Sequence, residues 1–352
     1  MNRKRVEFPR VLKTGATLLV VLRICMSLTG CSGSNSSDTT YLGEWYKKSS
    51  YEGVARSGAV SFVIDGKAYV GTGYDGDKWL KDFYMYDADK NNWFKRADFP
   101  GIARNAAVAF TVNGKGYVGT GSDGTTYLKD FYEYDPIADS WTQIADFPGV
   151  PRYEAAAFSI DNLGYVTSGY GGADAGTAGN YLKDMYAYNP STGEWTQMAS
   201  YSGDKLVNAF AFAIDGKGYV GGGMNNGVLN QQFWEYDPLN NIWNVKNDLQ
   251  DDAVDTDTND SGYTIARQLG VTFVINGKGY VLLGTRATLD AGVWEYNPST
   301  DTWTQKNSFE GAVRDSAVGF ALGNYGYVAT GRSSSLRFDD LWMFDPTAID
   351  VD

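Results

Sequence analysis

Residues 115–141 read KGYVGTGSDGTTYLKDFYEYDPIADSW, and this stretch decides the fold because its pattern returns throughout the chain. Its landmarks are Tyr117, Gly121, Tyr134 and Trp141. The first tyrosine, followed four residues later by a glycine, recurs six times, at Tyr69, Tyr117, Tyr165, Tyr219, Tyr280 and Tyr327. The later aromatic residue recurs at Tyr86, Tyr134, Tyr188, Tyr236, Tyr296 and Phe344, and the first five of these precede a tryptophan by seven residues. A fixed period of this length indicates one supersecondary unit repeated along the chain.

Each repeat predicts four short strands, which we call a to d. Strand a is apolar and alternating, as in residues 59–64, and the pair Asp65-Gly66 after it tolerates the positive φ angles of a type I′ hairpin turn. Strand b carries the first tyrosine, strand c the later aromatic residue, and strand d the tryptophan. Equivalent turn pairs follow strand a in other repeats, at Asn113-Gly114, Asp215-Gly216 and Asn276-Gly277.

The two ends of the chain predict how the repeats close. The last repeat stops at Asp352, before its tryptophan strand, whereas residues 41–53 contain Gly43-Glu44-Trp45 and match the end of the third repeat at Gly193-Glu194-Trp195. We therefore expect residues 41–53 to supply strand d of the sixth unit, which leaves no open edge between units. The prediction is an all-β fold, a six-bladed β-propeller over residues 41–352.

These repeats resemble the kelch family. A kelch blade has an arginine before strand a, a tyrosine and a glycine pair in strand b, and spaced tyrosine and tryptophan in strands c and d. Here only Gly222-Gly223 keeps the full glycine pair. The resemblance covers residues 41–352 and implies the propeller fold, but propellers carry many unrelated activities.

The first 30 residues predict a signal peptide rather than part of the fold. A basic start precedes an apolar run over residues 16–28, and Leu28-Thr29-Gly30-Cys31 resembles the lipobox of bacterial lipoproteins. The run is shorter than the roughly twenty residues that a membrane span needs. We expect lipidation at Cys31, a polar linker over residues 31–40, and attachment to the cell envelope, at the outer membrane of a Gram-negative bacterium, with the periplasmic or surface side left open.

Cleavage before Cys31 would make the chain more acidic. The leader holds six of the 30 Lys and Arg and one of the 42 Asp and Glu, so the remainder has 24 against 41, a net charge of −17. This argues against nucleic acid as a partner. Cys25 would leave with the leader, so the lipidated cysteine would be the only one and no disulfide is expected.

Insertions predict which face of the propeller carries function. Alternating strands place the a–b and c–d turns on one face, and the b–c and d–a loops on the other. Successive tryptophans are 48 residues apart in three cases but 54 and 60 apart in two others. The extra residues fall around 171–180, a b–c loop, and 251–262, a d–a connection, so both are on the same face.

That face also carries a register of arginines. Six residues before the phenylalanine of strand a stand Arg56, Arg104, Arg152, Arg267 and Arg314, whereas the fourth blade has Leu206 there with Lys205 one residue earlier. These cations are candidates for binding an anionic ligand at the channel mouth. The competing interpretation, which we weigh more heavily, is ion pairing with the acids that open strand c: Asp82, Asp130, Asp184 and Asp340. Arg267 is the exception, because Gly292 stands at the acid position, and we expect it to be free.

Aromatic residues in the b–c loops are a second candidate surface. Trp79, Tyr127 and Tyr181 occupy equivalent places in three blades. Exposed rings of this kind stack on sugars or on partner side chains. They are equally suited to covering the interface between blades.

The chain contains no histidine, which restricts its chemistry. Copper-oxidase chemistry of the kind found in galactose-oxidase-like kelch propellers is excluded, and we predict no metal, no cofactor and no catalytic triad. The leading prediction is a lipid-anchored module that binds a glycan, a small anion or an envelope protein. One alternative, implied by resemblance to the six-bladed kelch-type sialic acid mutarotases, is a sugar mutarotase or epimerase, with Glu154 as the acid we nominate. Another is a scaffold subunit of an outer-membrane complex.

Overall fold

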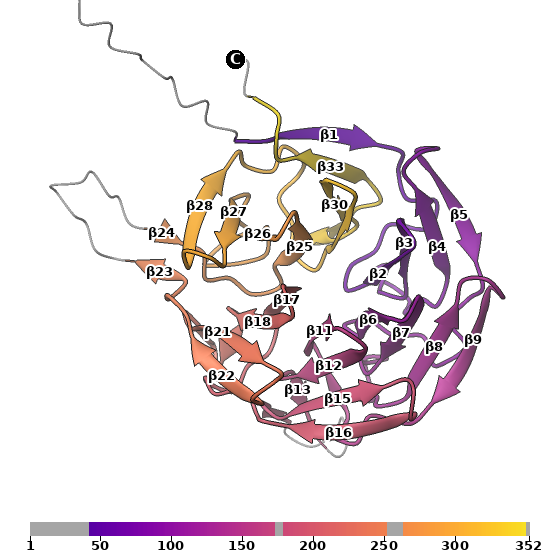
Figure 1. The fold of residues 1–352 in the computed structure, drawn as a ribbon. Coiled ribbons are helices and arrows are strands. Elements are labelled where there is room, and N and C mark those ends of the chain that lie inside the picture. The colour runs from indigo at the N-terminus through magenta and orange to yellow at the C-terminus, as the bar shows by residue number, and fades with distance from the viewer. Residues whose placement is uncertain (1–41, 173–178, 252–262, 350–352) are drawn as a thin grey trace, which may run out of the picture. The chain divides into compact units, whose positions relative to one another are not determined.

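The computed structural model describes residues 42–172, 179–251 and 263–349, and the predictions made for residues 1–40 and Cys31 lie outside them. The described residues form six four-stranded antiparallel sheets around a central axis, within a unit that spans Thr40–Asp352 (Figure 1). This confirms the predicted all-β, six-bladed propeller. No helix in the described ranges is long and apolar enough to cross a membrane.

The six a strands line the axis, and each packs against the a strand of the next blade to complete the ring. They are β2 (Val60–Ile64), β6 (Val108–Val112), β11 (Ala156–Ile160), β17 (Phe210–Ile214), β25 (Val271–Ile275) and β29 (Val318–Leu322). The b strands follow: β3 (Lys67–Gly71), β7 (Lys115–Gly119), β12 (Leu163–Thr167), β18 (Lys217–Gly221), β26 (Lys278–Leu282) and β30 (Tyr325–Ala329). We number the blades 1 to 6 in this order.

The c and d strands complete each blade toward the rim. The c strands are β4 (Phe83–Asp87), β8 (Phe131–Asp135), β15 (Met185–Asn189), β21 (Phe233–Asp237), β27 (Val293–Asn297) and β33 (Leu341–Asp345). The d strands are β5 (Asn92–Arg96), β9 (Ser140–Ile144), β16 (Glu194–Met198), β22 (Ile242–Val245), β28 (Thr302–Lys306) and, for blade 6, β1 (Glu44–Lys48).

Four short ribbons extend the b–c and d–a loops. They are formed by β10 (Arg152–Tyr153), β13 (Tyr170–Gly171) and β14 (Asn180–Tyr181), by β19 (Met224–Asn225) and β20 (Val228–Leu229), by β23 (Gln250–Asp251) and β24 (Tyr263–Thr264), and by β31 (Arg332–Ser333) and β32 (Leu336–Arg337).

The ring closes through the N-terminal strand, as predicted. β1 pairs antiparallel with β33, with Trp45 opposite Phe344. Trp45 is 4% exposed and packs edge-on against Phe309, with ring centroids 4.8 Å apart. Residues from both ends of the propeller therefore share one sheet (Figure 1).

Close contact between blades explains the small residue before the strand-b tyrosine. Gly116 faces the ring of Phe62 from the preceding blade, and an added Cβ would lie 2.3 Å from a ring carbon. The same contact recurs at Gly164, Gly218, Gly279 and Gly326. In these five blades the close approach requires that no side chain stands there, whereas blade 1 has the small Ala68 at this position.

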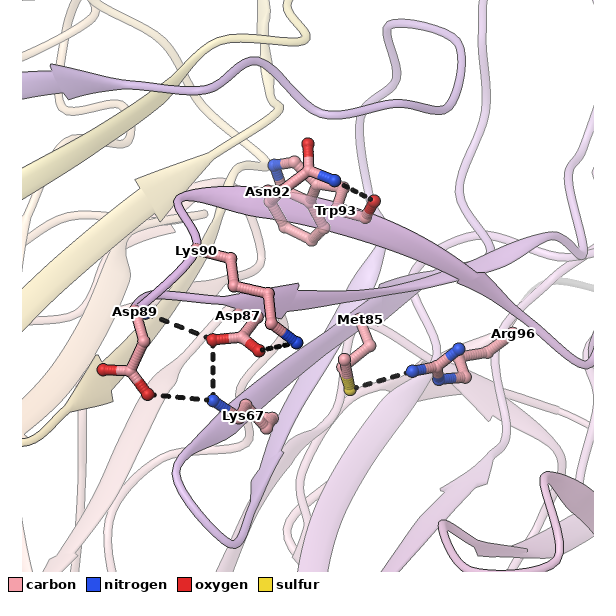
Figure 2. Close-up of polar contacts among 8 residues, drawn as sticks. All are labelled: Lys67, Met85, Asp87, Asp89, Lys90, Asn92, Trp93 and Arg96. Carbon is pink, nitrogen blue, oxygen red and sulfur yellow. Dashed lines mark hydrogen bonds and ion pairs between the residues drawn. The ribbon is translucent and has the colours of Figure 1, made fainter.

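Ion pairs brace strands b and c on the face of the short turns. Lys67 Nζ lies 2.7 Å from Asp87 Oδ1, and Lys90 Nζ lies 3.2 Å from the other carboxylate oxygen (Figure 2). Equivalent Lys–Asp pairs occur in blades 2 and 4, at 2.6 and 3.0 Å. The lysines are partly exposed, so these pairs contribute little stability.

Candidate active site

The register of arginines lies inside the blades rather than at the channel mouth. All five arginine side chains are 0% exposed, and none lines the cavity on the axis. In blades 1, 2, 3 and 6 the guanidinium group forms two hydrogen bonds of 2.5–3.0 Å to the aspartate that precedes strand c. The ion pairs that the register predicted are therefore present, and the geometry gives these four arginines a structural role. Ligand binding by these arginines stays a prediction.

Each of these arginines also fixes an unusual backbone turn. Arg104 NH1 donates to the carbonyl of Thr120, which has a φ of +58° immediately before Gly121. This position is the first of the kelch glycine pair, where an ordinary side chain is strained. Blade 4 alone has the full pair, and there Leu206 replaces the arginine while Asn230 donates to the carbonyl of Gly222. Blades that have the arginine therefore have a strained non-glycine residue at this position, and blade 4, which lacks the arginine, has glycine there.

Replacing Arg104 with leucine is expected to lower the free energy of unfolding by about 3 kcal/mol. The variant leaves Asp130 and the carbonyl of Thr120 without their guanidinium partner. Urea unfolding measures the loss. The matched control is the double variant Arg104→Leu, Asp130→Gln, which copies Leu206 and Gln232 of blade 4 and should recover part of it. A single variant as stable as the wild type would contradict this account.

Two positions beyond the arginine register, the chain turns left-handed in every blade. The residues have φ between 52° and 62° and are Gly58, Ala106, Glu154, Asn208, Leu269 and Ser316. Each donates its backbone N–H to the carbonyl of the equivalent residue in the preceding blade, and the six hydrogen bonds of 2.8–3.3 Å close a ring around the axis. Five of these residues are not glycine, and such strain is often found at functional sites.

This ring borders a cavity of about 170 Å³ on the face of the b–c and d–a loops. Residues of all six blades line it, and most are small and uncharged. Among the lining residues only Glu154 and Arg332 are ionisable. They come from blades 3 and 6, which are three steps apart in a ring of six, so they approach the cavity from opposite sides.

The environment of Glu154 suits a group that transfers protons. Burial raises the pKa of the Glu154 carboxyl to about 7, while Arg332 and a hydrogen bond from Asn208 oppose the rise. Both protonation states are therefore populated near neutral pH, which suits a general acid or base. Glu154 was a candidate only through resemblance to the mutarotases, and in the structure it lines the cavity on the axis.

The guanidinium group of Arg332 is hydrogen-bonded to the protein through its Nε, while its two terminal nitrogens are free to bind a ligand. Its Nε donates to Asp315 Oδ1 at 2.8 Å, and Ser316 and Thr285 donate to the same carboxylate at 2.8 and 3.3 Å. Its side chain is 42% exposed, and its two terminal nitrogens have no hydrogen-bond partner among the described residues. A guanidinium presented in this way suits a carboxylate ligand.

Arg332 and Asp315 were not predicted from the sequence, although the repeats contain a signal for them. The residue after the strand-b glycine is Tyr74, Ser122, Tyr170, Met224, Thr285 or Arg332 in the six blades, so blade 6 alone has a charge there. Each of these residues bridges to the one immediately after the arginine register, and in blade 6 this partner is Asp315. The alignment of repeats could have identified this ion pair.

The three loop aromatics are partly buried, and none of them lines the cavity. Trp79 Nε1 donates to Asn105 Oδ1 at 3.1 Å, and Asn105 is a lining residue. Tyr127 stacks on Tyr153, the residue before Glu154, with ring centroids 5.2 Å apart. Tyr181 meets Tyr170 edge-on at 5.3 Å, and Tyr170 also meets Tyr153. Binding by these rings stays a prediction.

The remaining predicted cations differ from one another. Lys205 is exposed and does not line the cavity. Arg267 is buried and has no hydrogen-bonded carboxylate partner; its Nε and NH1 donate to backbone carbonyls, and its NH2 has no hydrogen-bond partner among the described residues. Arg314 is engaged by Asp340.

Comparison with known proteins agrees with the fold. The family model for N-acetylneuraminate epimerase matches residues 117–269, a range that includes Glu154 but not Arg332. The solved structure named "Structure of YjhT" has a TM-score of 0.67 at 16% identity, over 84% of this chain and 96% of that chain. A search of curated proteins finds no match. The chain is a kelch-type propeller that resembles the N-acetylneuraminate epimerases.

Proposed function

We propose that this protein is a mutarotase that interconverts the anomers of a carboxylated sugar of the N-acetylneuraminate type. The observation that carries the proposal is that Glu154 and Arg332 lie on opposite sides of a cavity whose other lining residues are uncharged. The partial match to the epimerase family names the sugar. This function was the alternative predicted from the sequence, and we now favour it over the binding module that was the leading prediction.

The reaction needs only proton transfer. A base removes the proton of the anomeric hydroxyl, the bond between the anomeric carbon and the ring oxygen breaks, and the ring oxygen takes up a proton. The open-chain ketone rotates and closes on its other face, with the same protons returned. Atoms and charge balance without any oxidant, reductant or cofactor.

The residues divide these tasks by their chemistry. Glu154 removes and returns the proton, because a carboxyl with a pKa of about 7 exchanges it readily near neutral pH. Arg332 binds the substrate carboxylate through its free edge, which places the adjacent anomeric carbon in the cavity. Asp315 acts as a positioning residue, because it fixes the Nε edge of that guanidinium.

Nuclear magnetic resonance tests the proposal directly. Freshly dissolved single-anomer N-acetylneuraminate should approach its anomeric equilibrium faster with the protein than without it. A neutral sugar such as glucose, which has no carboxylate for Arg332, is the control and should show no acceleration. Failure to accelerate N-acetylneuraminate would overturn the proposal, and binding without anomer exchange would favour a binding module instead.

Attachment to the membrane is a separate proposal. The lipid at Cys31 and the cell-envelope location rest on the motif at residues 28–31, which lies outside the described residues. An extracytoplasmic sugar mutarotase would meet its substrate there before uptake. The role of scaffold subunit stays a prediction without further support.

A further inference from the structure

Glu154 has a polar neighbour on one side only of the ring of left-handed residues. Ala106 precedes it in the ring and Asn208 follows it. The backbone N–H of Asn208 donates to the carbonyl of Glu154 at 3.1 Å, so the two residues are joined through the main chain. Both also line the cavity. Asn208 is therefore placed to hold the carboxyl of Glu154 from blade 4.

The side chain of Asn208 donates in two directions. Its Nδ2 donates to Gln268 Oε1 at 3.2 Å, and the same side chain also donates to the carboxyl of Glu154. An amide NH2 group has two hydrogens, so it can serve both acceptors. Its Oδ1 is buried and accepts no hydrogen bond among the described residues. Reversing the amide would turn this oxygen toward two other acceptors, so the partners of Nδ2 fix its orientation.

Gln268 is held by the backbone of blade 5. Its N–H and carbonyl pair with the carbonyl and N–H of Thr285, at 3.0 and 2.9 Å. Thr285 Oγ1 in turn donates to Asp315 at 3.3 Å, and Asp315 accepts from Arg332. A continuous series of contacts through blades 4, 5 and 6 thus connects the carboxyl of Glu154 with the guanidinium of Arg332.

The charged and titratable groups around Glu154 act in both directions. Burial raises the pKa of its carboxyl most, Arg332 of blade 6 lowers it, and Asp315 of the same blade raises it. Tyr153, the preceding residue, has a pKa raised to about 12 by burial and by Glu154, so it is neutral near pH 7. The hydrogen bond from Asn208 adds to Arg332 in stabilising the charged carboxyl, as a donor to a carboxylate does.

We propose that Asn208 is the positioning residue of Glu154: its Nδ2, oriented by Gln268, donates to the carboxylate and holds it toward the substrate in the cavity. The catalytic consequence of this contact rests on the proposed function, whereas the hydrogen bond itself does not. Asn208 acts through Glu154, so its loss should alter proton transfer more than binding by Arg332.

Asn208→Leu is the first test, because Leu269 occupies the same ring position in blade 5 with a φ of 54°, so this backbone accepts leucine. Without the donor the carboxylate of Glu154 is less stable, and the inflection of the pH–rate profile should move up by about one pH unit. At pH 9, where the carboxylate predominates in both proteins, kcat should still be lower by about tenfold while KM changes little. Anomer exchange followed by proton NMR measures these values.

A ¹³C titration of the Glu154 carboxyl separates this inference from the proposed function. In the full chain labelled with ¹³C-glutamate, its resonance is the one that Glu154→Gln removes, and its midpoint should shift up by the same amount in Asn208→Leu. Gln268→Leu should shift the midpoint in the same direction by less, because the amide keeps its donor but loses its orientation. Asn225→Leu is the matched control, since Asn225 lies in blade 4 outside the cavity on the axis, and it should leave the midpoint unchanged.

The outcomes are distinct. An unchanged midpoint in Asn208→Leu would overturn the hydrogen bond, and a shifted midpoint with wild-type kcat at pH 9 would overturn the positioning role. A shifted midpoint in a protein that accelerates no anomer exchange would instead overturn the proposed function and keep Asn208 as the residue that holds Glu154.

Discussion

Glu154→Gln is expected to lower the rate of anomer interconversion by about 10²–10⁴-fold, the usual contribution of a positioned acid or base. Glutamine keeps the size of the side chain and its place in the ring of left-handed residues, but it cannot accept and return a proton. The rate constant at saturation should fall while KM changes little, because Arg332 still binds the substrate carboxylate. Proton NMR of the two anomers measures both quantities.

The pH dependence gives this prediction a second readout. The reacting form of Glu154 is the carboxylate, so the wild-type rate should rise with pH and level off above about 7, the raised pKa. The Glu154→Gln variant should lose that inflection. Glu133→Gln is the matched control, because Glu133 accepts from Tyr117 at 2.8 Å and does not line the cavity. A Glu154→Gln variant within threefold of the wild type would show that the carboxyl does not transfer the proton.

The protonation of Glu154 should also make the free energy of unfolding depend on pH. The folded pKa of Glu154 is raised above the ordinary value of 4.5, so folding favours the protonated carboxyl. Its contribution is fully present below pH 4.5 and is lost as pH rises to about 7, by about 3 kcal/mol in all. Wild type and Glu154→Gln should therefore differ less in stability at pH 4 than at pH 8.

Deleting residues 1–48 is expected to destabilise the whole propeller by more than the 3–5 kcal/mol typical of removing one buried tryptophan. Blade 6 loses its outer strand β1 and with it Trp45, which packs on Phe309 and Phe344. The deletion also exposes the edge of β33, which is prone to pairing with another chain. Urea unfolding and size-exclusion chromatography measure the two consequences.

Single substitutions separate the lost side chain from the lost strand. Trp45→Ala should cost about 3–5 kcal/mol. Trp195→Ala removes the equivalent residue of blade 3, which is less buried than Trp45, and should cost less. If the truncated chain unfolds at the same urea concentration as the full chain, β1 does not stabilise the ring.

The repeat, the number of blades and the closure of the ring could all be predicted from the sequence, because they follow from spacing and from side-chain alternation within one unit. The pairing of arginines with aspartates was also readable, since blade 4 lacks both residues together. Equivalent positions in the aligned repeats reveal such pairs because every blade has the same local geometry, so two residues that are in contact in one blade are in contact in the others.

Which side chains face the axis could not be predicted from the sequence and depends on the packing of the blades. A left-handed turn two residues after the arginine register directs Glu154 to the cavity and leaves Arg152 buried inside the blade. Arg332 reaches the same cavity because rotation around the ring brings blade 6 opposite blade 3. Sequence spacing contains neither the backbone turn nor the burial that raises the pKa of Glu154, since both arise from the packing of six blades against one another.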